Sequence, residues 1–216
     1  NNPTGTVYGK AAFERFLAAV PPHVLTVIDE AYFEFVTDPD SPDGMRYFDA
    51  GRPIVIARTF SKIYSLAGLR VGYAICPPEL AVALHKVREP FNTTVVAQVA
   101  AIAALEDDEH CERTVSLVRT ERSFLATELA RRQAVVNPSL GNFLLVELPI
   151  PFGPLEPEFA RRGVILRPMG GWGFPLAFRV SVGTHEENLR FLAAFDDLLA
   201  AGKLGLSTAA VPVGAG

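Results

Sequence analysis

The apolar residues near the start of the chain recur at helical spacing, and short β-branched runs follow them. The first periodic segment places its apolar residues at positions i, i+3, i+4 and i+7, as in an amphipathic helix: Phe13, Phe16, Leu17 and Val20. The run from Val24 to Ile28, which ends in Asp29, predicts a strand buried on both faces, as in a parallel sheet covered by helices. Runs at 54–57 and 71–75 then alternate with loops and helical segments. This alternation predicts an α/β layer.

The middle of the chain is predicted to be helical. Residues 94–105 are rich in alanine, and the stretch after Asp107 carries one apolar face, formed by Val115, Val118, Leu125 and Leu129. The remainder predicts a smaller α+β unit with strands near residues 143–147, 164–166 and 178–182.

The last predicted helix begins with a capping box. Thr184 can cap the helix while Glu187, three residues later, reaches back to the cap. The helix carries an apolar face formed by Phe191, Phe195, Leu198 and Leu199. From Gly202 the chain is rich in small residues, so we expect a frayed end and a flexible tail over 205–216.

Composition and charge exclude several classes of function. The 216 residues carry a formal net charge of -4 with both signs mixed along the chain, so we expect no nucleic-acid partner. The two cysteines form neither a disulfide framework nor a metal-ligand cluster, which favours a cytoplasmic location. We find no signal peptide and no apolar stretch long enough to span a bilayer, so no membrane partner is expected.

The opening residues have the composition of a connection between elements. Residues 1–5 read Asn-Asn-Pro-Thr-Gly, without an initiator Met, and such a tract is typical of a turn inside a domain. We therefore expect the chain to be a portion of a longer protein.

Two groups of polar residues stand at the ends of predicted strands, where open α/β sheets place their ligands. Asp29 closes the first strand, and residues 59–62 (Thr-Phe-Ser-Lys) follow the second. Hydroxyl groups beside a lysine can bind phosphate, and a partly desolvated lysine can act as a Schiff-base nucleophile. Taken separately, Asp29 fits a loop-entry acid or helix cap better than a ligand-binding residue, and Lys62 fits a surface lysine in a polar loop better than a nucleophile.

Four motifs taken together carry a family resemblance. Residues 2–5 (Asn-Pro-Thr-Gly), 29–32 (Asp-Glu-Ala-Tyr), 61–62 (Ser-Lys, with an arginine eight residues later) and 178–183 (Phe-Arg-Val-Ser-Val-Gly) occur in this order. In order and spacing they resemble the fold-type I aminotransferases that depend on pyridoxal 5'-phosphate (PLP). The resemblance extends over nearly the whole chain.

The resemblance implies an α/β fold with two domains. Residues 1–92 would form part of the PLP-binding large domain, a mostly parallel sheet with helices on both faces. Residues 93–204 would form linking helices and a small α+β C-terminal domain, followed by the tail at 205–216.

The resemblance also assigns the cofactor site. Lys62 is implied to hold PLP as a Schiff base and then to move a proton of the substrate. Asp29 is implied to pair with the pyridine nitrogen, since a carboxylate there keeps the ring protonated. Asn2 and Tyr32 are implied to form hydrogen bonds with the ring oxygen O3′. The cofactor phosphate is assigned to two hydroxyls and one guanidinium: Thr59, Ser61 and Arg70.

The substrate residues follow from the same likeness. Arg179 is implied to clamp a substrate carboxylate, and its apolar neighbours indicate a partly buried setting in which an arginine needs an anion. Within the superfamily the closest likeness is to histidinol-phosphate aminotransferases, carried by residues 29–35, 58–62, 86–92, 142–143 and 183–188. By that likeness Arg167 contacts the substrate phosphate and Asn142 belongs to the substrate site. The alternative for Arg167 is a solvated residue before a proline.

The resemblance implies amino-group transfer between histidinol phosphate and a 2-oxo acid. The family resemblance suggests 2-oxoglutarate as this acid. It also implies that the full-length protein is a homodimer. An aromatic amino acid aminotransferase, and a threonine-phosphate decarboxylase or carbon–sulfur lyase of the same fold, stay open. A third alternative is an inactive fragment or dimerisation remnant, against which the intact set of Asp29, Tyr32, Lys62 and Arg70 argues.

Family members also carry an upstream loop around the cofactor phosphate and an aromatic that stacks on the ring. We therefore expect this chain alone to hold an incomplete site.

Overall fold

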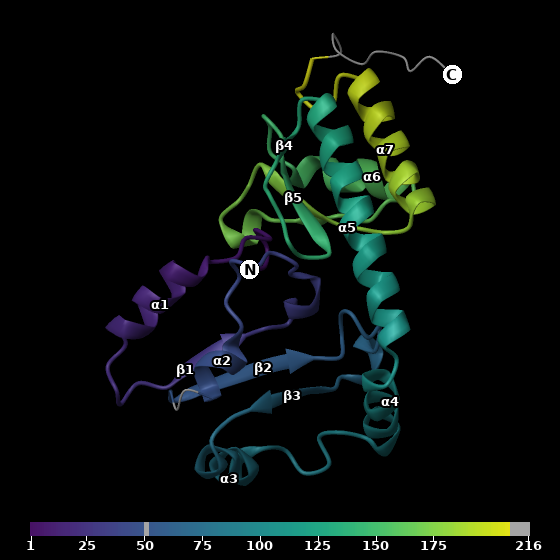
Figure 1. Ribbon diagram of the computed structural model, residues 1–216. Coiled ribbons are helices and arrows are strands. Elements are labelled where there is room, and N and C mark those ends of the chain that lie inside the picture. Colours follow the sequence, from purple (N-terminus) through teal and green to yellow (C-terminus); the bar gives the residue numbers. More distant parts are fainter. Residues whose placement is uncertain (50–51, 208–216) are drawn as a thin grey trace. The chain divides into compact units, whose positions relative to one another are not determined.

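The computed structural model describes residues 1–49 and 52–207, which fall into two compact units (Figure 1). One unit comprises Val7–Val115, and the other comprises Asn1–Thr6 together with the chain from Ser116 onward. The sequence-based boundaries at residues 92 and 204 describe family domains and stay a prediction. The prediction of a mixed α/β fold is confirmed, since both units combine a sheet with helices.

The sheet of the first unit has the order β1-β2-β3, formed by β1 (Thr26–Asp29), β2 (Ile54–Thr59) and β3 (Gly72–Ile75). Strand β1 pairs with β2 in parallel, with Asp29 opposite Ala57, whereas β2 pairs with β3 antiparallel. Of the two strand pairings described in this sheet, one is parallel, as expected, and the other is antiparallel.

One face of this sheet is covered by helices. Leu17 of α1 (Lys10–Ala19) packs with Ile54 and Ile56 of β2, and Met45 of α2 (Gly44–Asp49) packs against the same cluster. Successive strand residues point to opposite faces, and Val27 on the other face of β1 is 62% exposed. The expectation that this strand is buried on both faces is therefore wrong for the described chain.

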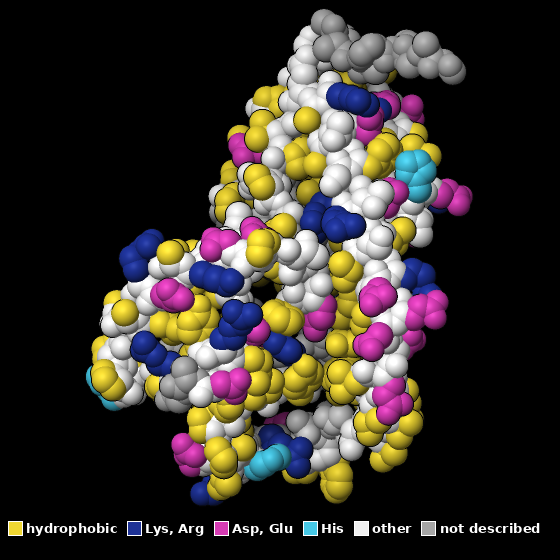
Figure 2. All heavy atoms as spheres, viewed as in Figure 1, with side chains coloured by type: hydrophobic (Ala, Val, Ile, Leu, Met, Phe, Trp, Pro, Cys, Tyr) yellow, Lys and Arg dark blue, Asp and Glu magenta, His cyan; other side chains and the backbone are white. Residues whose placement is uncertain are grey.

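Two helices follow the sheet of this unit along the chain. Helix α3 (Pro78–Val87) has a proline at its first position, where the missing N–H costs nothing. Helix α4 (Val95–Leu105) is apolar at every position except Gln98, and its buried residues are Ala97 and Ala101. Figure 2 shows hydrophobic side chains gathered over α4, where Val95, Val96 and Val99 are each more than half exposed.

The long helix α5 (Asp108–Arg131) confirms the predicted apolar face in the middle of the chain. Val118, Leu125 and Leu129 are buried, and Val115 is half-buried. The acidic pair Asp108 and Glu109 stands in the first turn, where carboxylates favour the positive end of the helix dipole.

The second unit packs helices on an antiparallel sheet with the order β4-β5-β7-β6. The strands are β4 (Val135–Val136), β5 (Phe143–Glu147), β6 (Arg167–Pro168) and β7 (Ala177–Ser181). Helices α5, α6 (Glu156–Arg161) and α7 (His185–Ala200) contribute to one core cluster with the sheet. Its largest fully buried rings come from four phenylalanines: Phe152, Phe159, Phe178 and Phe195.

The last helix confirms the predicted capping box. The Oγ1 of Thr184 accepts from the N–H of Glu187, and the Glu187 carboxylate accepts from the N–H of Thr184 at 2.8 Å. The predicted apolar face of α7 is buried at every position named from the sequence.

Two sequence-based boundaries are corrected. The strand expected at 164–166 begins instead at Arg167, because Arg167 and Pro168 are the residues that find partners on β7, while Ile165 is 90% exposed. The end expected to fray from Gly202 is still packed at Leu204, which is fully buried, and Leu206 is half-buried against the core. Residues 208–216 of the expected tail lie outside the described residues.

No helix in the described part of the chain is both long and apolar enough to cross a membrane.

Replacing Leu125 with alanine tests the packing of α5. Leu125 is fully buried in the core of the second unit, so we expect a loss of about 2–5 kcal/mol in the free energy of unfolding. Leu117 on the same helix is 41% exposed, and Leu117→Ala should stay within about 0.5 kcal/mol of the parent. Urea denaturation measures both variants, and equal losses would contradict this account of the core.

Candidate functional site

The carboxyl ends of β1 and β2 lie at one edge of the sheet because the two strands are parallel. Asp29 ends β1, and its Oδ1 accepts from the N–H of Ala31 at 3.0 Å, which holds the carboxylate in a turn at the strand end. Thr59 ends β2 two residues beyond Ala57, the partner of Asp29. This edge therefore carries both groups of polar residues singled out from the sequence.

The loop after β2 is closed by its own hydrogen bonds. The Oγ1 of Thr59 accepts from the N–H of Ser61 at 3.0 Å, and the N–H of Leu66 donates to the carbonyl of Phe60 at 2.9 Å. Phe60 and Ile63 are buried and anchor the loop from below. Ser61 and Lys62 stand between these two anchors and are half-buried as a result.

Lys62 lies over the ring of Tyr32, which the family resemblance assigns to the same cofactor site. Its Nζ is 5.4 Å from the centroid of the Tyr32 ring, which follows β1 by three residues. An ammonium over an aromatic face is stabilised by the ring quadrupole. The arrangement holds the amine at the sheet edge that also carries Asp29.

Two residues of the same loop adopt left-handed backbone conformations. Ser65 has φ 58° and Arg70 has φ 53°, and neither is glycine. Such conformations cost roughly 1–3 kcal/mol each and concentrate at functional sites. The Nη1 of Arg70 donates to the carbonyl of Ala67 at 2.8 Å, so the guanidinium is oriented and its other N–H groups can face an anion.

An ion pair behind this edge was not predicted from the sequence. Glu30 is buried, and its Oε2 accepts from the Nε of Arg58 at 2.8 Å and lies 2.8 Å from Nη2. Its Oε1 accepts from the N–H of Gly44 at 2.8 Å, and the guanidinium of Arg58 lies 4.1 Å from the centroid of the Phe33 ring. The pair fixes the residues next to Asp29 and Thr59.

The electrostatics of this ion pair favour the charged state of Arg58. Burial alone lowers the pKa of the guanidinium, but hydrogen bonds with Glu30 and Tyr73 outweigh it, so the net pKa of Arg58 is raised. The sequence did contain a signal for this pair. Glu30 and Arg58 are oppositely charged residues that each follow an apolar run predicted to be a strand.

His110 is a second residue that the sequence did not single out. From the first turn of α5 its Nε2 lies 2.9 Å from the carbonyl oxygen of Ile63, the residue after Lys62. Tyr64 packs on Phe60 with ring centroids 5.0 Å apart, and burial raises the pKa of Tyr64 to about 12. The lysine loop is therefore held by a helix as well as by the sheet.

The second unit places two predicted substrate residues opposite each other. Arg167 of β6 and Arg179 of β7 are register partners, so their side chains leave the same face of the sheet. Like charges directly opposite on neighbouring strands repel each other. Within the described residues no carboxylate lies at ion-pair distance from either guanidinium. This geometry suits the binding of an anion.

Asn2 and Phe143 hold Arg179. The Nη1 of Arg179 donates to the Oδ1 of Asn2 at 2.5 Å, and the guanidinium carbon lies 5.2 Å from the centroid of the Phe143 ring. Asn142, beside Phe143, is half-buried, and its backbone carbonyl accepts from the N–H of Val182. The Asn142 side chain is not among the groups that line the pocket described below.

Gly5 fixes the opening tract that carries Asn2. Its N–H donates to the carbonyl of Asn1 at 2.7 Å, and its carbonyl accepts from the N–H of Leu140 at 2.9 Å. Gly5 has φ +78°, and a Cβ there would lie 2.2 Å from the Oγ of Ser139. Only glycine combines this conformation with this close approach.

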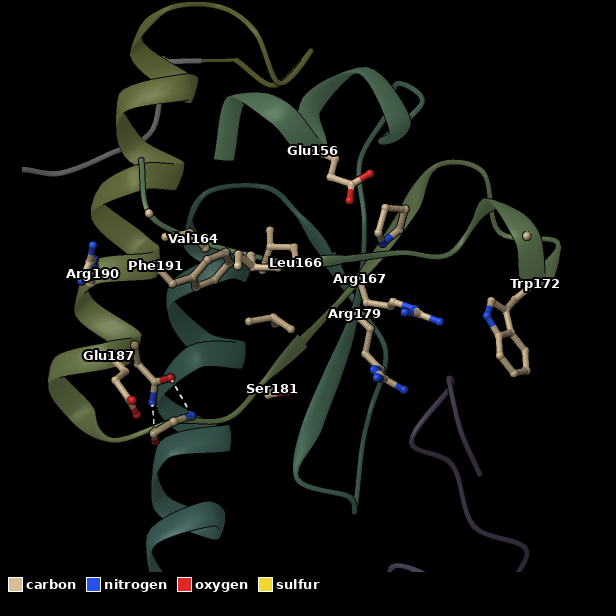
Figure 3. Close-up of a pocket in the computed structure, with 17 residues that line it drawn as sticks. Glu156, Val164, Leu166, Arg167, Trp172, Arg179, Ser181, Glu187, Arg190 and Phe191 are labelled. Carbon is tan, nitrogen blue, oxygen red and sulfur yellow. Dashed lines mark hydrogen bonds between the residues drawn. The ribbon is translucent and has the colours of Figure 1, made fainter. Parts of the chain in front are cut away.

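Both arginines line a pocket of about 850 Å³ in the second unit (Figure 3). Its walls come from β6 and the residues before it, from β7, and from the first half of α7. Trp172, in the turn after β6, completes one side. The structure thus gathers the predicted residues into two groups, each within one unit: a lysine group at the sheet edge and an arginine group with Asn2.

Comparison with known proteins defines the class. The family described as aminotransferase class I and II matches residues 1–195. The chain therefore belongs to the aminotransferase class I and II family.

Individual relatives are named more specifically. The histidinol-phosphate aminotransferase of Anaeromyxobacter sp. (strain Fw109-5) is 47% identical over 202 residues, which are 93% of this chain and 56% of that protein. Histidinol-phosphate aminotransferase 2 of Methylococcus capsulatus is 46% identical and is matched over 54% of its length by 92% of this chain. The chain thus spans about half the length of these curated relatives.

Among solved structures, the histidinol-phosphate aminotransferase of Sinorhizobium meliloti, in complex with pyridoxal-5'-phosphate, superimposes with a TM-score of 0.84. It is 27% identical in sequence, and the match covers 93% of this chain and 55% of that one.

Replacing Gly5 with alanine tests the docking of the opening tract. The added Cβ meets Ser139 in a strained conformation, so we expect the free energy of unfolding to fall by more than about 1 kcal/mol. Gly153→Ala is the control, because a Cβ at that position meets no atom within 4 Å. An unchanged urea midpoint for Gly5→Ala would show that the tract is not held as described.

Proposed function

We propose that the protein to which this chain belongs is a PLP-dependent aminotransferase that moves the amino group between histidinol phosphate and a 2-oxo acid, 2-oxoglutarate in the simplest case. The names of the relatives at 47% and 46% identity support the substrate. The observation that carries the proposal is the half-buried amine of Lys62 above the Tyr32 ring, at the sheet edge that ends in Asp29.

The lysine group fits the cofactor in its donor chemistry. Asp29 supplies a carboxylate for a protonated pyridine nitrogen, and Tyr32 supplies a phenol for the ring oxygen, a role we also give to the amide of Asn2. Thr59, Ser61 and Arg70 supply hydroxyls and a guanidinium, which are the donors a phosphate needs. When bound, PLP supplies an electron sink for the carbanion of the amino substrate.

Lys62 has two tasks in this proposal. Its amine would hold the cofactor covalently and, when free, would take a proton from the substrate and return it. A base that moves a proton must keep its position, and the buried side chains of Phe60 and Ile63 restrict the loop that bears Lys62. The Glu30–Arg58 pair fixes the ends of β1 and β2 relative to each other.

The arginine group recognises anions. Arg179 would bind the carboxylate of the 2-oxo acid, and Arg167 would bind the phosphate of histidinol phosphate. One site must accept both substrates in turn, and two opposing guanidinium groups can meet either anion. Asn142 would contribute to the substrate site from the start of β5, where its backbone carbonyl accepts from the N–H of Val182 beyond β7.

Two further expectations belong to the whole protein. We propose that it is a homodimer and that it works in the cytoplasm, as the family likeness and the two cysteines indicate.

Incubating the whole protein with histidinol phosphate and 2-oxoglutarate tests the reaction. Formation of glutamate supports amino transfer. Release of carbon dioxide from threonine phosphate, or glutamate formed only with aromatic amino acids, would support the decarboxylase or the aromatic aminotransferase instead.

Replacing Lys62 with alanine should abolish covalent retention of PLP. Borohydride treatment followed by denaturation should leave the cofactor on the parent protein and on Lys86→Ala, because Lys86 is an exposed lysine of α3. Mass spectrometry measures the bound cofactor. A reduced cofactor still attached to the Lys62→Ala protein would refute the assignment.

Replacing Arg167 with alanine should separate the two substrates. Loss of a charge-assisted contact should raise KM for histidinol phosphate by roughly tenfold or more and change KM for glutamate much less. Arg161→Ala is the control, since the Arg161 side chain is 66% exposed on α6. Equal rises for both substrates would remove the phosphate role of Arg167.

A further inference from the structure

Trp172 is the one tryptophan of the chain, and 57% of its surface is exposed. Tryptophan is usually highly buried, so an indole that faces solvent at the wall of a pocket calls for an explanation. This indole lines the same pocket as Arg167 and Arg179. In Figure 3 the two guanidinium groups extend toward the side of the pocket on which Trp172 lies.

The turn that carries Trp172 is well fixed. Met169 is buried with Leu145 and Ala177, and its N–H donates to the carbonyl of Ala177 at 3.1 Å. The carbonyl of Met169 accepts from the N–H of Trp172 at 2.9 Å, and Gly173 ends the turn with φ +86°. The backbone of Trp172 is thus held from the core while its ring is left in the pocket.

The pocket therefore combines two different recognition elements. The opposing arginines bind an anion, and the flat indole face can contact a planar ring a short distance away. A ligand that carried only an anion would leave the indole exposed to water. A ligand with an anionic group joined through a short linker to a flat heteroaromatic ring would use both.

We propose that Trp172 is a specificity-determining residue that contacts the heteroaromatic ring of a phosphate-bearing substrate whose phosphate is bound by Arg167. The inference rests on the proposed function and deepens it, because it assigns the ring preference to a named side chain. Histidinol phosphate has this chemistry, with an imidazole ring and a phosphate in one molecule.

Two ligands without an amino group test the contact by binding alone. Imidazolylethyl phosphate and cyclopentylethyl phosphate carry the same anion on the same linker, and they differ in whether the ring is flat and aromatic. Calorimetry with the whole PLP-loaded protein gives both affinities without any turnover. Trp172→Ala should weaken the imidazole ligand by about tenfold and the cyclopentyl ligand by about twofold or less.

Three variants complete the design. Trp172→Phe should restore most of the affinity for the imidazole ligand, because phenylalanine keeps an aromatic face. Phe174→Ala removes an aromatic side chain of the same turn that does not line the pocket, and it should leave both affinities unchanged. Arg167→Ala should weaken both ligands alike, since both carry the phosphate.

Fluorescence gives an independent readout. The emission lost in Trp172→Phe relative to the parent belongs to Trp172, and the imidazole ligand should change that component while the cyclopentyl ligand changes it less. Equal weakening of both ligands in Trp172→Ala, or weakening of neither, would overturn the proposal. Failure of the proposed function appears separately, as absence of glutamate formation even where the ring-dependent binding holds.

Discussion

The parallel register of β1 and β2 is the constraint on which the lysine group depends. Asp29 stands opposite Ala57, and a slip of one residue would turn every side chain of β1 to the other face of the sheet. The Glu30–Arg58 ion pair opposes such a slip, because it joins the residue after β1 to a residue of β2 while the same carboxylate binds the backbone of α2. The ion pair therefore fixes the strand ends that precede Tyr32 and Lys62.

In the arginine group, by contrast with the Glu30–Arg58 pair, a guanidinium is held without an opposite charge. Its two arginines stand opposite each other on antiparallel strands, and the guanidinium of Arg179 is held by an amide oxygen and an aromatic face. Neutral partners orient Arg179 without neutralising it. Such a site keeps its positive charge for a ligand, and the repulsion between its members is relieved when an anion binds.

The sequence predicted the elements whose signals are local and repeated. The apolar face of α5, the capping box at Thr184 and the strand at 143–147 all followed from spacing alone. The short helices α2 and α6, each of six residues, offered too little periodicity to be recognised. Strand β6 was placed too early because pairing with β7, a contact distant in sequence, sets where it begins.

The candidate site residues were proposed from motifs rather than from geometry. Considered singly, Lys62 and Asp29 did not indicate a function. The order and spacing of the motifs that contain them indicated the family resemblance. Glu30 and Arg58 stood inside the same motifs but received no role, since an ion pair between strand ends is visible only once the register is known. Trp172 was missed because an isolated tryptophan in a glycine-rich turn carries no periodic signal.

The contact between Asn2 and Arg179 joins residues 177 positions apart. Closing so long a loop costs chain entropy before any contact repays it, and contacts of this kind slow folding. On a ribosome, Asn2 leaves the exit tunnel long before Arg179 is made. Asn2 therefore cannot meet its partner until β7, which carries Arg179, has been made, so this contact forms late in the synthesis of the chain.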